Sequence, residues 1–301
     1  RTLRLIRPTT LLTCEDHSEW VQVTEHPDGA GLGFDATWYS NYYHNLIGDT
    51  GRGTDCANLL RTAGMGGNGE LAMDRFAGIM AATGRKTVVY HESHDEAGNS
   101  EHSGRTLMVA IAADKDTPPP EGELRSVAEA RVRFVAGMTF LSAGTPMFLM
   151  GEEVGAVKDF TYDGFMENRE DLHGERAGKG RQLFRFYADL IRLRRRHHAL
   201  STTNLEILHI HNADRVLAFQ RWNGPEHYLI VSTLSDFGYP DGYTVNVPRD
   251  AQGSWREIFT SDATLYGGSG VSNETETATV EGQVTVKVPA RGFVVLRHMP
   301  R

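Results

Sequence analysis

Acidic residues directly follow short apolar runs in the first two thirds of the chain, where strands are predicted. These acids are Glu15, Asp16, Asp35, Asp95, Glu152 and Glu153. Carboxyl groups gathered from the ends of several strands suit glycoside chemistry, in which one acid protonates a leaving oxygen while others stabilise or capture a cationic sugar. In a (β/α)8 barrel the catalytic face is built at those strand ends. The alternative is that the same acids only cap helices and line solvated loops.

Predicted strands alternate with predicted helices before about residue 201. The strands are Thr10–Glu15, Gly33–Thr37, Thr87–His91 and Pro146–Met150. A Ser-x-x-Glu capping box at Ser126 predicts a helix that runs to about Leu141. Apolar positions between Leu183 and Ile191 lie on one face of a second, amphipathic helix. This alternation indicates a parallel α/β sheet or barrel.

After about Ser201 the pattern changes to short β-rich runs. Val216–Trp222 and His227–Leu234 flank Asn223-Gly224-Pro225, where Asn-Gly is a strong hairpin signal. The further runs are Tyr243–Val247, Gln283–Val288 and Gly292–Leu296. Because these runs are separated by Gly, Asp and Pro, the last part of the chain is predicted to form a small all-β domain.

Composition and charge exclude several classes of protein. The 301 residues carry 31 Lys and Arg against 39 Asp and Glu, a formal net charge of −8, which disfavours nucleic acid and anionic membranes as partners. No apolar run approaches the ~20 residues needed to cross a bilayer, and we expect no leader segment. The two cysteines, Cys14 and Cys56, make no disulfide framework. We therefore expect a cytoplasmic protein, and nothing in the sequence predicts its oligomeric state.

Five ordered segments carry longer motifs. They read Leu-Leu-Thr-Cys-Glu-Asp-His over residues 11–17, Gly-Leu-Gly-Phe-Asp-Ala-Thr-Trp over 31–38, Ser-His-Asp-Glu over 93–96, Gly-Thr-Pro-Met-Phe-Leu-Met-Gly-Glu-Glu over 144–153 and Trp-Arg-Glu-Ile-Phe-Thr-Ser-Asp over 255–262. Together they resemble the α-amylase superfamily (glycoside hydrolase family 13), and most of all its 1,4-α-glucan branching enzymes. The resemblance implies the C-terminal half of a (β/α)8 TIM barrel, strands five to eight, over residues 1–201. An α-amylase-type β-sandwich domain is then implied over residues 202–301.

The resemblance also implies roles for four side chains. Glu15 matches the general acid/base, and Asp95 matches the carboxylate that grips sugar hydroxyls and stabilises the oxocarbenium-like transition state. His94 would hydrogen-bond the same sugar, and Trp38 would be a sugar-stacking platform, with ordinary packing as an equal alternative. The implied substrate is an α-1,4-glucan such as glycogen, starch or amylose. No cofactor and no metal is expected.

Structural alternatives accompany the remaining candidates. Asp35 is more readily explained as structural than as catalytic. Glu152 and Glu153 would either line the cleft or only hold the loop after the last strand. Cys14 stands beside no obvious base, and we expect it to pack within its strand.

One element that the family's chemistry requires is missing. Retaining chemistry also needs an aspartate nucleophile in a segment such as Asp-Gly-Phe-Arg-Trp-Asp, but the only Asp-Gly-Phe here begins at Asp163 and precedes Met166. Without the nucleophile no covalent glycosyl intermediate forms. Half a barrel also leaves Thr10–Glu15 as an edge strand whose backbone groups have no neighbouring strand on one side. We therefore expect this fragment to have no appreciable branching activity. The alternatives are an α-amylase-type or trehalose-releasing hydrolase and a non-catalytic glucan-binding remnant.

Overall fold

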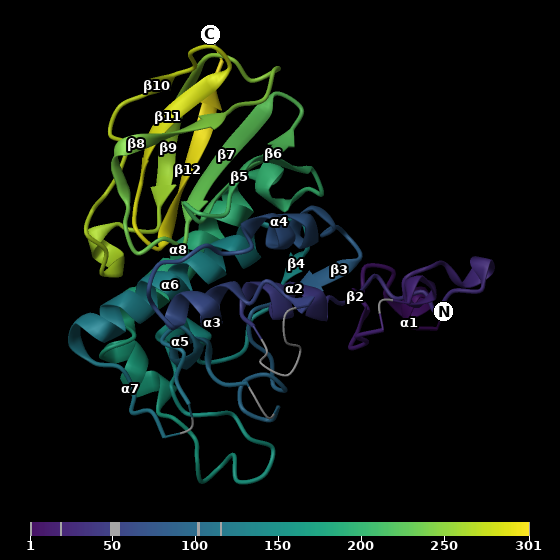
Figure 1. Ribbon diagram of the computed structural model, residues 1–301. Coiled ribbons are helices and arrows are strands. Elements are labelled where there is room, and N and C mark those ends of the chain that lie inside the picture. The colour runs from purple at the N-terminus through teal and green to yellow at the C-terminus, as the bar shows by residue number, and fades with distance from the viewer. Residues whose placement is uncertain (1, 19, 49–54, 101–102, 115, 301) are drawn as a thin grey trace.

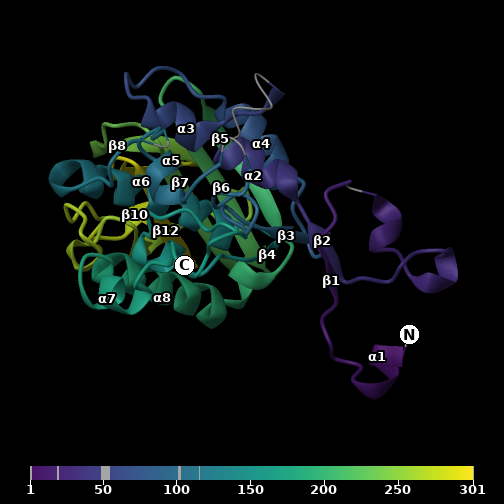
Figure 2. The same ribbon diagram turned by 90° about the horizontal axis from the view of Figure 1, so that it is seen from below.

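The computed structural model describes residues 2–18, 20–48, 55–100, 103–114 and 116–300. Figure 1 shows a β-rich C-terminal part stacked on a helical layer, while the N-terminal residues, with helix α1 (Thr2–Ile6), reach away from both. Figure 2 shows this arm from below, joined to the body through β1 and β2. Two short 3-10 helices lie in the arm, η1 (Val21–Val23) and η2 (Pro27–Gly29).

A parallel sheet carries the strand ends at which the acids were predicted. Its strands lie in the order β1 (Thr13–Cys14), β2 (Ala36–Trp38), β3 (Thr87–Val89) and β4 (Thr145–Pro146). The four predicted strands are therefore present and parallel, although shorter than predicted. One reason is visible at β1, where the Leu12 N–H donates to Asp35 Oδ2 (2.8 Å) rather than to a carbonyl of β2.

Helices follow β2, β3 and β4 along the chain. They are α2 (Ser40–Leu46), α3 (Leu59–Gly64), α4 (Met73–Ala81), α5 (Thr106–Val109), α6 (Gly122–Leu141), α7 (Leu172–Ala177) and α8 (Arg181–Arg196), with the 3-10 helices η4 (Glu152–Val154) and η5 (His198–Ser201). The amphipathic helix predicted around Leu183 is confirmed as α8, whose buried positions recur at helical spacing. No helix in the part of the chain that the structure describes combines the length and the apolar composition that spanning a membrane requires.

Helix α6 begins before the predicted capping box, so that prediction is wrong. The residue that precedes the helix is Glu121, and Ser126 lies one turn inside, where its hydroxyl donates to the Gly122 carbonyl (3.2 Å). Glu129 does not reach back to cap the backbone, because its carboxylate accepts from Arg125 Nε at 2.8 Å. A local Ser-x-x-Glu pattern therefore marked an interior turn of the helix rather than its start.

The C-terminal part is all β, as predicted, apart from the 3-10 helix η6 (Thr264–Tyr266). One sheet has the order β10-β9-β12-β7-β6-β5 and the other pairs β11 with β8. The strands are β5 (Leu205–His211), β6 (Val216–Asn223), β7 (Glu226–Thr233), β8 (Tyr239–Asn246), β9 (Ser254–Thr260), β10 (Thr277–Ala278), β11 (Gln283–Val288) and β12 (Gly292–Met299). The predicted hairpin is confirmed, with Gly224 (φ 55°) and Pro225 as the turn residues between the paired Asn223 and Glu226. Glycine at the first central position suits a type II′ turn.

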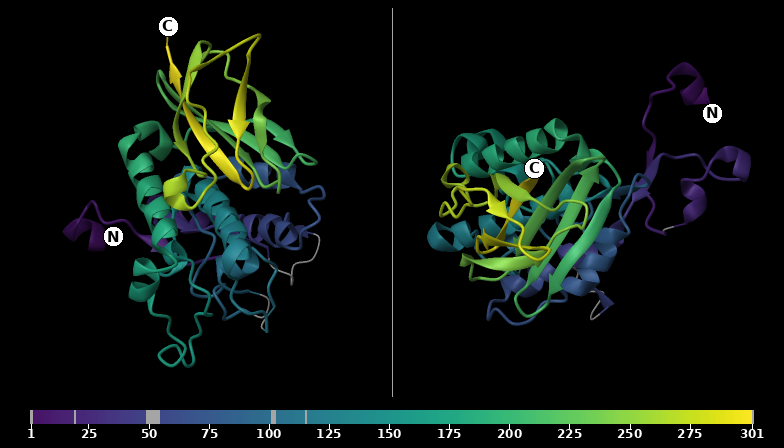
Figure 3. Two further views of the ribbon diagram at one scale, coloured as in Figure 1. Left: turned by 90° about the vertical axis from the view of Figure 1, so that its left-hand side faces the viewer. Right: turned by 90° about the horizontal axis from the view of Figure 1, so that it is seen from above.

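The large sheet is buried on both faces and therefore takes part in two cores. Successive side chains of a strand point to opposite faces, and alternate residues of β6, β7 and β12 divide accordingly. Those in the core shared with α6 and α8 are Leu217, Phe219, Tyr228, Ile230, Phe293 and Val295. Those packed with β8 and β11 are Ala218, Leu229, Val231, Val294 and Leu296. Figure 3 shows the sheets lying over the helices that the first set contacts.

Close packing joins α6 to this sheet. A Cβ atom added at Gly137 would lie 2.1 Å from the Phe293 ring, so glycine is what allows the helix to approach β12. At the C-terminal end of the same helix, the carbonyls of Phe140 and Ser142 accept from Arg194 at 2.6 and 2.9 Å. Arg221 of β6 donates to the Ser142 carbonyl as well, at 2.6 Å. These bonds satisfy carbonyls that a helix end leaves without intrahelical partners.

Candidate active site

The carboxyl ends of β1 and β3 bring the two predicted catalytic acids together. Glu15 directly follows β1, and Asp95 lies on the segment that follows β3. A carboxylate oxygen of each, together with a ring nitrogen of His17, lie within 4.8 Å of one another. Side chains 80 residues apart in the sequence (95 − 15 = 80) therefore share one site. Glu15 and His17 are exposed, so this spacing by itself does not indicate a metal ion.

His94 lies between the two acids. Its Nε2 is 3.4 Å from Glu15 Oε1 and 3.7 Å from Asp95 Oδ1. The three side chains are between 36% and 44% exposed, which leaves their polar atoms accessible to a ligand. When protonated, the imidazolium faces both carboxylates, and when neutral it offers a hydrogen-bonding nitrogen between them.

Trp38, the predicted stacking platform, is largely buried at the end of β2. Only 9% of the residue is exposed. Its ring centroid lies 5.2 Å from that of Tyr90 and 5.6 Å from that of His94, with the His94 contact edge-on. Packing of this kind fixes the His94 ring, while the role of Trp38 toward a sugar stays a prediction.

In the Ser-His-Asp-Glu segment, the first and last residues support the backbone and the middle two belong to the site. Ser93 and Glu96 are buried, and the Ser93 hydroxyl both donates to Glu96 and accepts from the Asp95 N–H. Burial raises the pKa of Glu96 despite the hydrogen bond from Ser93. The inner pair thus holds the turn that presents His94 and Asp95 to solvent.

Tyr162 contacts the site, although the sequence did not indicate it. Its hydroxyl donates to Asp95 Oδ1, and this hydrogen bond, with smaller contributions from desolvation and from nearby carboxylates, raises the pKa of Tyr162 to about 12. The phenol therefore remains protonated, and can donate, over the whole physiological pH range. The available signal was the run of aromatic residues from Phe160 to Phe165 after the last parallel strand, because loops at that edge of such a sheet carry function.

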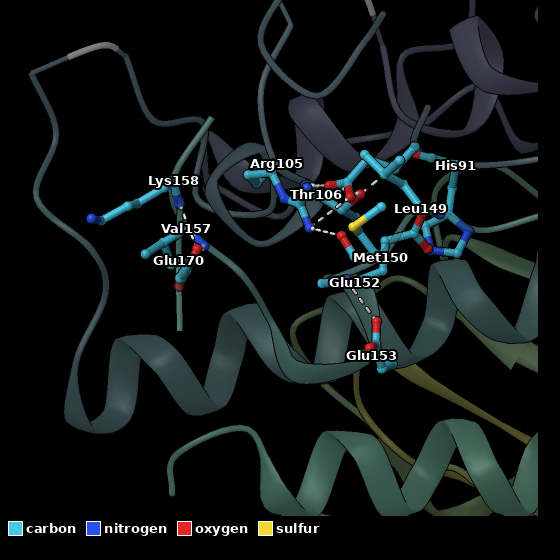
Figure 4. A network of polar contacts seen from close by, with 12 residues as sticks. His91, Arg105, Thr106, Leu149, Met150, Glu152, Glu153, Val157, Lys158 and Glu170 are labelled. Carbon is cyan, nitrogen blue, oxygen red and sulfur yellow. Dashed lines mark hydrogen bonds and ion pairs between the residues drawn. The ribbon is translucent and has the colours of Figure 1, made fainter. Parts of the chain in front are cut away.

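A buried polar network joins the segments that follow β3 and β4 (Figure 4). His91 Nε2 is 2.6 Å from Glu152 Oε2, and the other oxygen of Glu152 accepts from the Leu149 N–H at 2.7 Å. Arg105 pairs with Glu92 (3.2 Å) and donates to the Met150 carbonyl (2.9 Å). Burial raises the pKa of Glu92 to about 7, which the Arg105 charge only partly opposes.

Structural contacts are described for all three acids whose alternatives the sequence left open. Glu152 is buried and holds the loop after β4, and Glu153 accepts from the Gly151 N–H in the same loop. Asp35 accepts from the Leu12 N–H and from Arg4. All three therefore have structural contacts, as one of the predicted alternatives stated.

Residues 207–299 match the family model of the alpha amylase C-terminal all-beta domain. The chain is 26% identical to "1,4-alpha-glucan branching enzyme GlgB" of Marinobacter nauticus over 306 aligned residues, which cover 96% of this chain and 43% of that enzyme. It is 34% identical to the enzyme of the same name from Aromatoleum aromaticum over 171 residues, covering 54% and 25%. The chain thus spans less than half the length of these relatives.

Solved structures share the fold at lower identity. An alpha-amylase from H. orenii is similar with a TM-score of 0.61 and 17% identity, over 99% of this chain and 55% of that one. A Nostoc punctiforme debranching enzyme is similar with a TM-score of 0.65 and 15% identity, over 97% and 53%. These likenesses agree with parallel α/β elements followed by antiparallel all-β sheets of the amylase C-terminal type.

Proposed function

This chain resembles the α-amylase superfamily and, within it, the 1,4-α-glucan branching enzymes, and from that resemblance we propose that it carries part of a branching site. Glu15 would be the general acid/base and Asp95 the carboxylate that stabilises the transition state. The observation that carries the proposal is the convergence of Glu15 and Asp95, whose oxygens lie within 4.8 Å of each other in a solvent-accessible site.

The proposed reaction breaks an α-1,4 bond and forms an α-1,6 bond. Glu15 donates its proton to the leaving glycosidic oxygen as the sugar C1 bonds to an aspartate that this chain does not supply. Asp95 and His94 hold the hydroxyls of the same glucosyl unit, and Asp95 offsets the positive charge that develops on the ring. Glu15 then takes the proton of an acceptor 6-hydroxyl, which attacks C1 and releases the aspartate.

We further propose that residues 1–201 are the last four strands of a (β/α)8 barrel and that residues 202–301 are a β-sandwich domain. Four parallel strands in sequential order, with β1 and β4 as the edges, support the first part. The family match over 207–299 supports the second. In this proposal, the strand that bears the nucleophile would pair with β1 at its open edge, and residues 1–301 do not contain it.

Product analysis on amylose tests the proposal. We expect the 301-residue protein alone to form no new α-1,6 branches, because it lacks the nucleophile. Turnover that disappears in Glu15→Gln would contradict this expectation. Reading the coding DNA upstream of the first codon tests the larger claim, since an in-frame Asp-x-Phe-Arg-x-Asp segment is expected there. Binding to insoluble starch with no such segment upstream would instead support a non-catalytic glucan-binding protein.

Hydrolysis is the second candidate. The exposure of Glu15, His94 and Asp95 favours it, because water as well as an acceptor sugar reaches these groups. The two reactions share their carboxylates and differ in which nucleophile reaches the intermediate. On a protein that contains both parts of the site, rising reducing ends would indicate an α-amylase-type or trehalose-releasing hydrolase, whereas new branches would indicate transfer.

A further inference from the structure

The loop between η4 and α7, residues 157–170, has its two ends joined by one carboxylate. Glu170 Oε2 accepts from the Val157 N–H at 2.9 Å and from the Lys158 N–H at 3.0 Å (Figure 4). Asn168 Nδ2 donates to the Asp159 carbonyl at 2.9 Å and adds a second link between the two arms of the loop. A loop whose ends are joined in this way has a defined path, and such compact loops frequently carry function.

Asn99 anchors the middle of this loop to the segment that bears the candidate acids. Its Nδ2 donates to the carbonyls of His94 (2.5 Å) and Phe160 (2.9 Å). Its Oδ1 accepts from the Tyr162 N–H at 2.8 Å. The loop approaches closely here, because a Cβ atom at Gly98 would lie 2.5 Å from the Asp159 side chain. One amide side chain thus sets the position of Tyr162 relative to His94.

Tyr162 uses this anchored position in two ways. Its hydroxyl donates to Asp95 Oδ1, the oxygen that also faces His94 Nε2, so a ligand hydroxyl would bind at Oδ2. Its ring lies 5.8 Å from the His94 ring, and the residue is 55% exposed beside the site. An exposed aromatic face next to a fixed carboxylate can take the apolar face of a sugar ring while its hydroxyls bind the acid.

We propose that Tyr162 is a positioning residue for Asp95 and that its ring forms a wall against which a glucosyl unit packs, with Asn99 setting both. This rests on the proposed function, since the ligand is an α-1,4-glucan. The hydroxyl restrains the Asp95 carboxylate before the sugar arrives, so less ordering remains for the binding step. The ring adds apolar contact that the small polar groups of the site do not supply.

Calorimetric titration of the 301-residue protein with maltoheptaose tests the wall. Tyr162→Phe keeps the ring and removes the donor, and we expect up to about tenfold weaker binding, because the Asp95 carboxylate must then be ordered when the sugar binds. Tyr162→Ala removes both and is expected to weaken binding further. Phe237→Ala is the control, because Phe237 is an aromatic residue that is even more exposed, at 71%, and lies in the all-β part.

The ionisation of Tyr162 tests the positioning contact without any sugar. The ¹³C shift of its ring Cζ, followed upward in pH while circular dichroism stays native, should titrate near 12 in the unchanged protein. Asp95→Asn and Asn99→Ala should both return it toward the ordinary value. Titration at the ordinary value in the unchanged protein would overturn the contact.

The maltoheptaose titration and the pH titration of Tyr162 together distinguish a failure of this inference from a failure of the proposed function. If the unchanged protein does not bind maltoheptaose, the proposed function fails and the glucan wall fails with it, while the Tyr162 titration still judges the contact with Asp95. If the unchanged protein binds but Tyr162→Ala binds equally well, the wall is overturned and the proposed function stands.

Discussion

Arg194 of α8 and Arg221 of β6 donate to the same acceptor, the carbonyl of Ser142 just beyond the end of α6, at 2.9 and 2.6 Å. All the hydrogen-bond acceptors described for Arg221 are backbone carbonyls. Burial lowers the pKa of Arg194 to about 10 and that of Arg221 to about 9, because no neighbouring carboxylate in the described part of the chain offsets the loss of hydration. The helical layer and the all-β part are therefore joined by charged hydrogen bonds to a helix end, where a cation is favoured.

Replacing Arg221 with Met should destabilise the protein. The methionine fills much of the volume but leaves several buried carbonyls without a donor, and we expect the free energy of unfolding to fall by about 2–4 kcal/mol. Urea unfolding measures this change. Arg195→Met on the exposed face of α8 is the control, with an expected change within about 0.5 kcal/mol. Equal effects of the two substitutions would contradict the role of the shared carbonyl.

Two glycine-to-alanine substitutions in helices should change the free energy of unfolding in opposite directions. Gly137→Ala places a methyl group against the Phe293 ring, and we expect a loss of about 1–3 kcal/mol from the overpacked contact between α6 and β12. Gly78→Ala in α4 has nothing within 4 Å of the added Cβ, so better helix propensity should stabilise the protein by about 0.5–1 kcal/mol. Thermal unfolding of both variants checks the pair, and a stabilising Gly137→Ala would disprove the described approach of helix and strand.

The buried Glu92 should make stability depend on pH. Burial raises its pKa from 4.5 to about 7, with Arg105 and His91 opposing and Glu152 adding to the rise. Between these values the folded protein holds a proton that the unfolded chain has released. The contribution of Glu92 to stability is therefore fully present below about pH 4.5 and is lost as the pH rises through about 7.

Glu92→Gln should remove this dependence. The expected change in the slope of unfolding free energy is at most about 1.4 kcal/mol per pH unit, the limit for one proton. Urea unfolding of the unchanged protein and the variant across this window measures it, with Glu121→Gln, at an exposed side chain, as the control. Parallel curves for the unchanged protein and Glu92→Gln would refute the prediction.

Breaking the loop contact of Glu152 should loosen the exit of β4. Glu152→Gln keeps the shape but weakens the charged acceptor of the Leu149 N–H and the partner of His91. Amide hydrogen exchange at Leu149 should accelerate, while exchange at the Gly151 N–H, held by Glu153, should change less. Unchanged protection at Leu149 would show that the loop is held by other means.

Local patterns predicted the elements but not the contacts between distant segments. Most strand positions, α8, the hairpin and the meeting of Glu15 with Asp95 followed from apolar runs and from the resemblance, which the family match over 207–299 and the branching-enzyme relatives confirm. The strands β5, β9 and β10 were not predicted. The start of α6 did not follow, because Ser-x-x-Glu occurs inside helices as well as at their ends. Tyr162 was missed because its place depends on Asn99, 63 residues away in sequence.

The sheet that serves two cores has a consequence for dissecting the molecule. A fragment beginning at residue 202 would turn Leu217, Phe219, Ile230, Phe293 and Val295 toward water, since the helices that cover them lie earlier in the chain. Such a fragment would expose a large apolar surface and would tend to self-associate. The layers should accordingly melt in one cooperative transition rather than as two independent bodies.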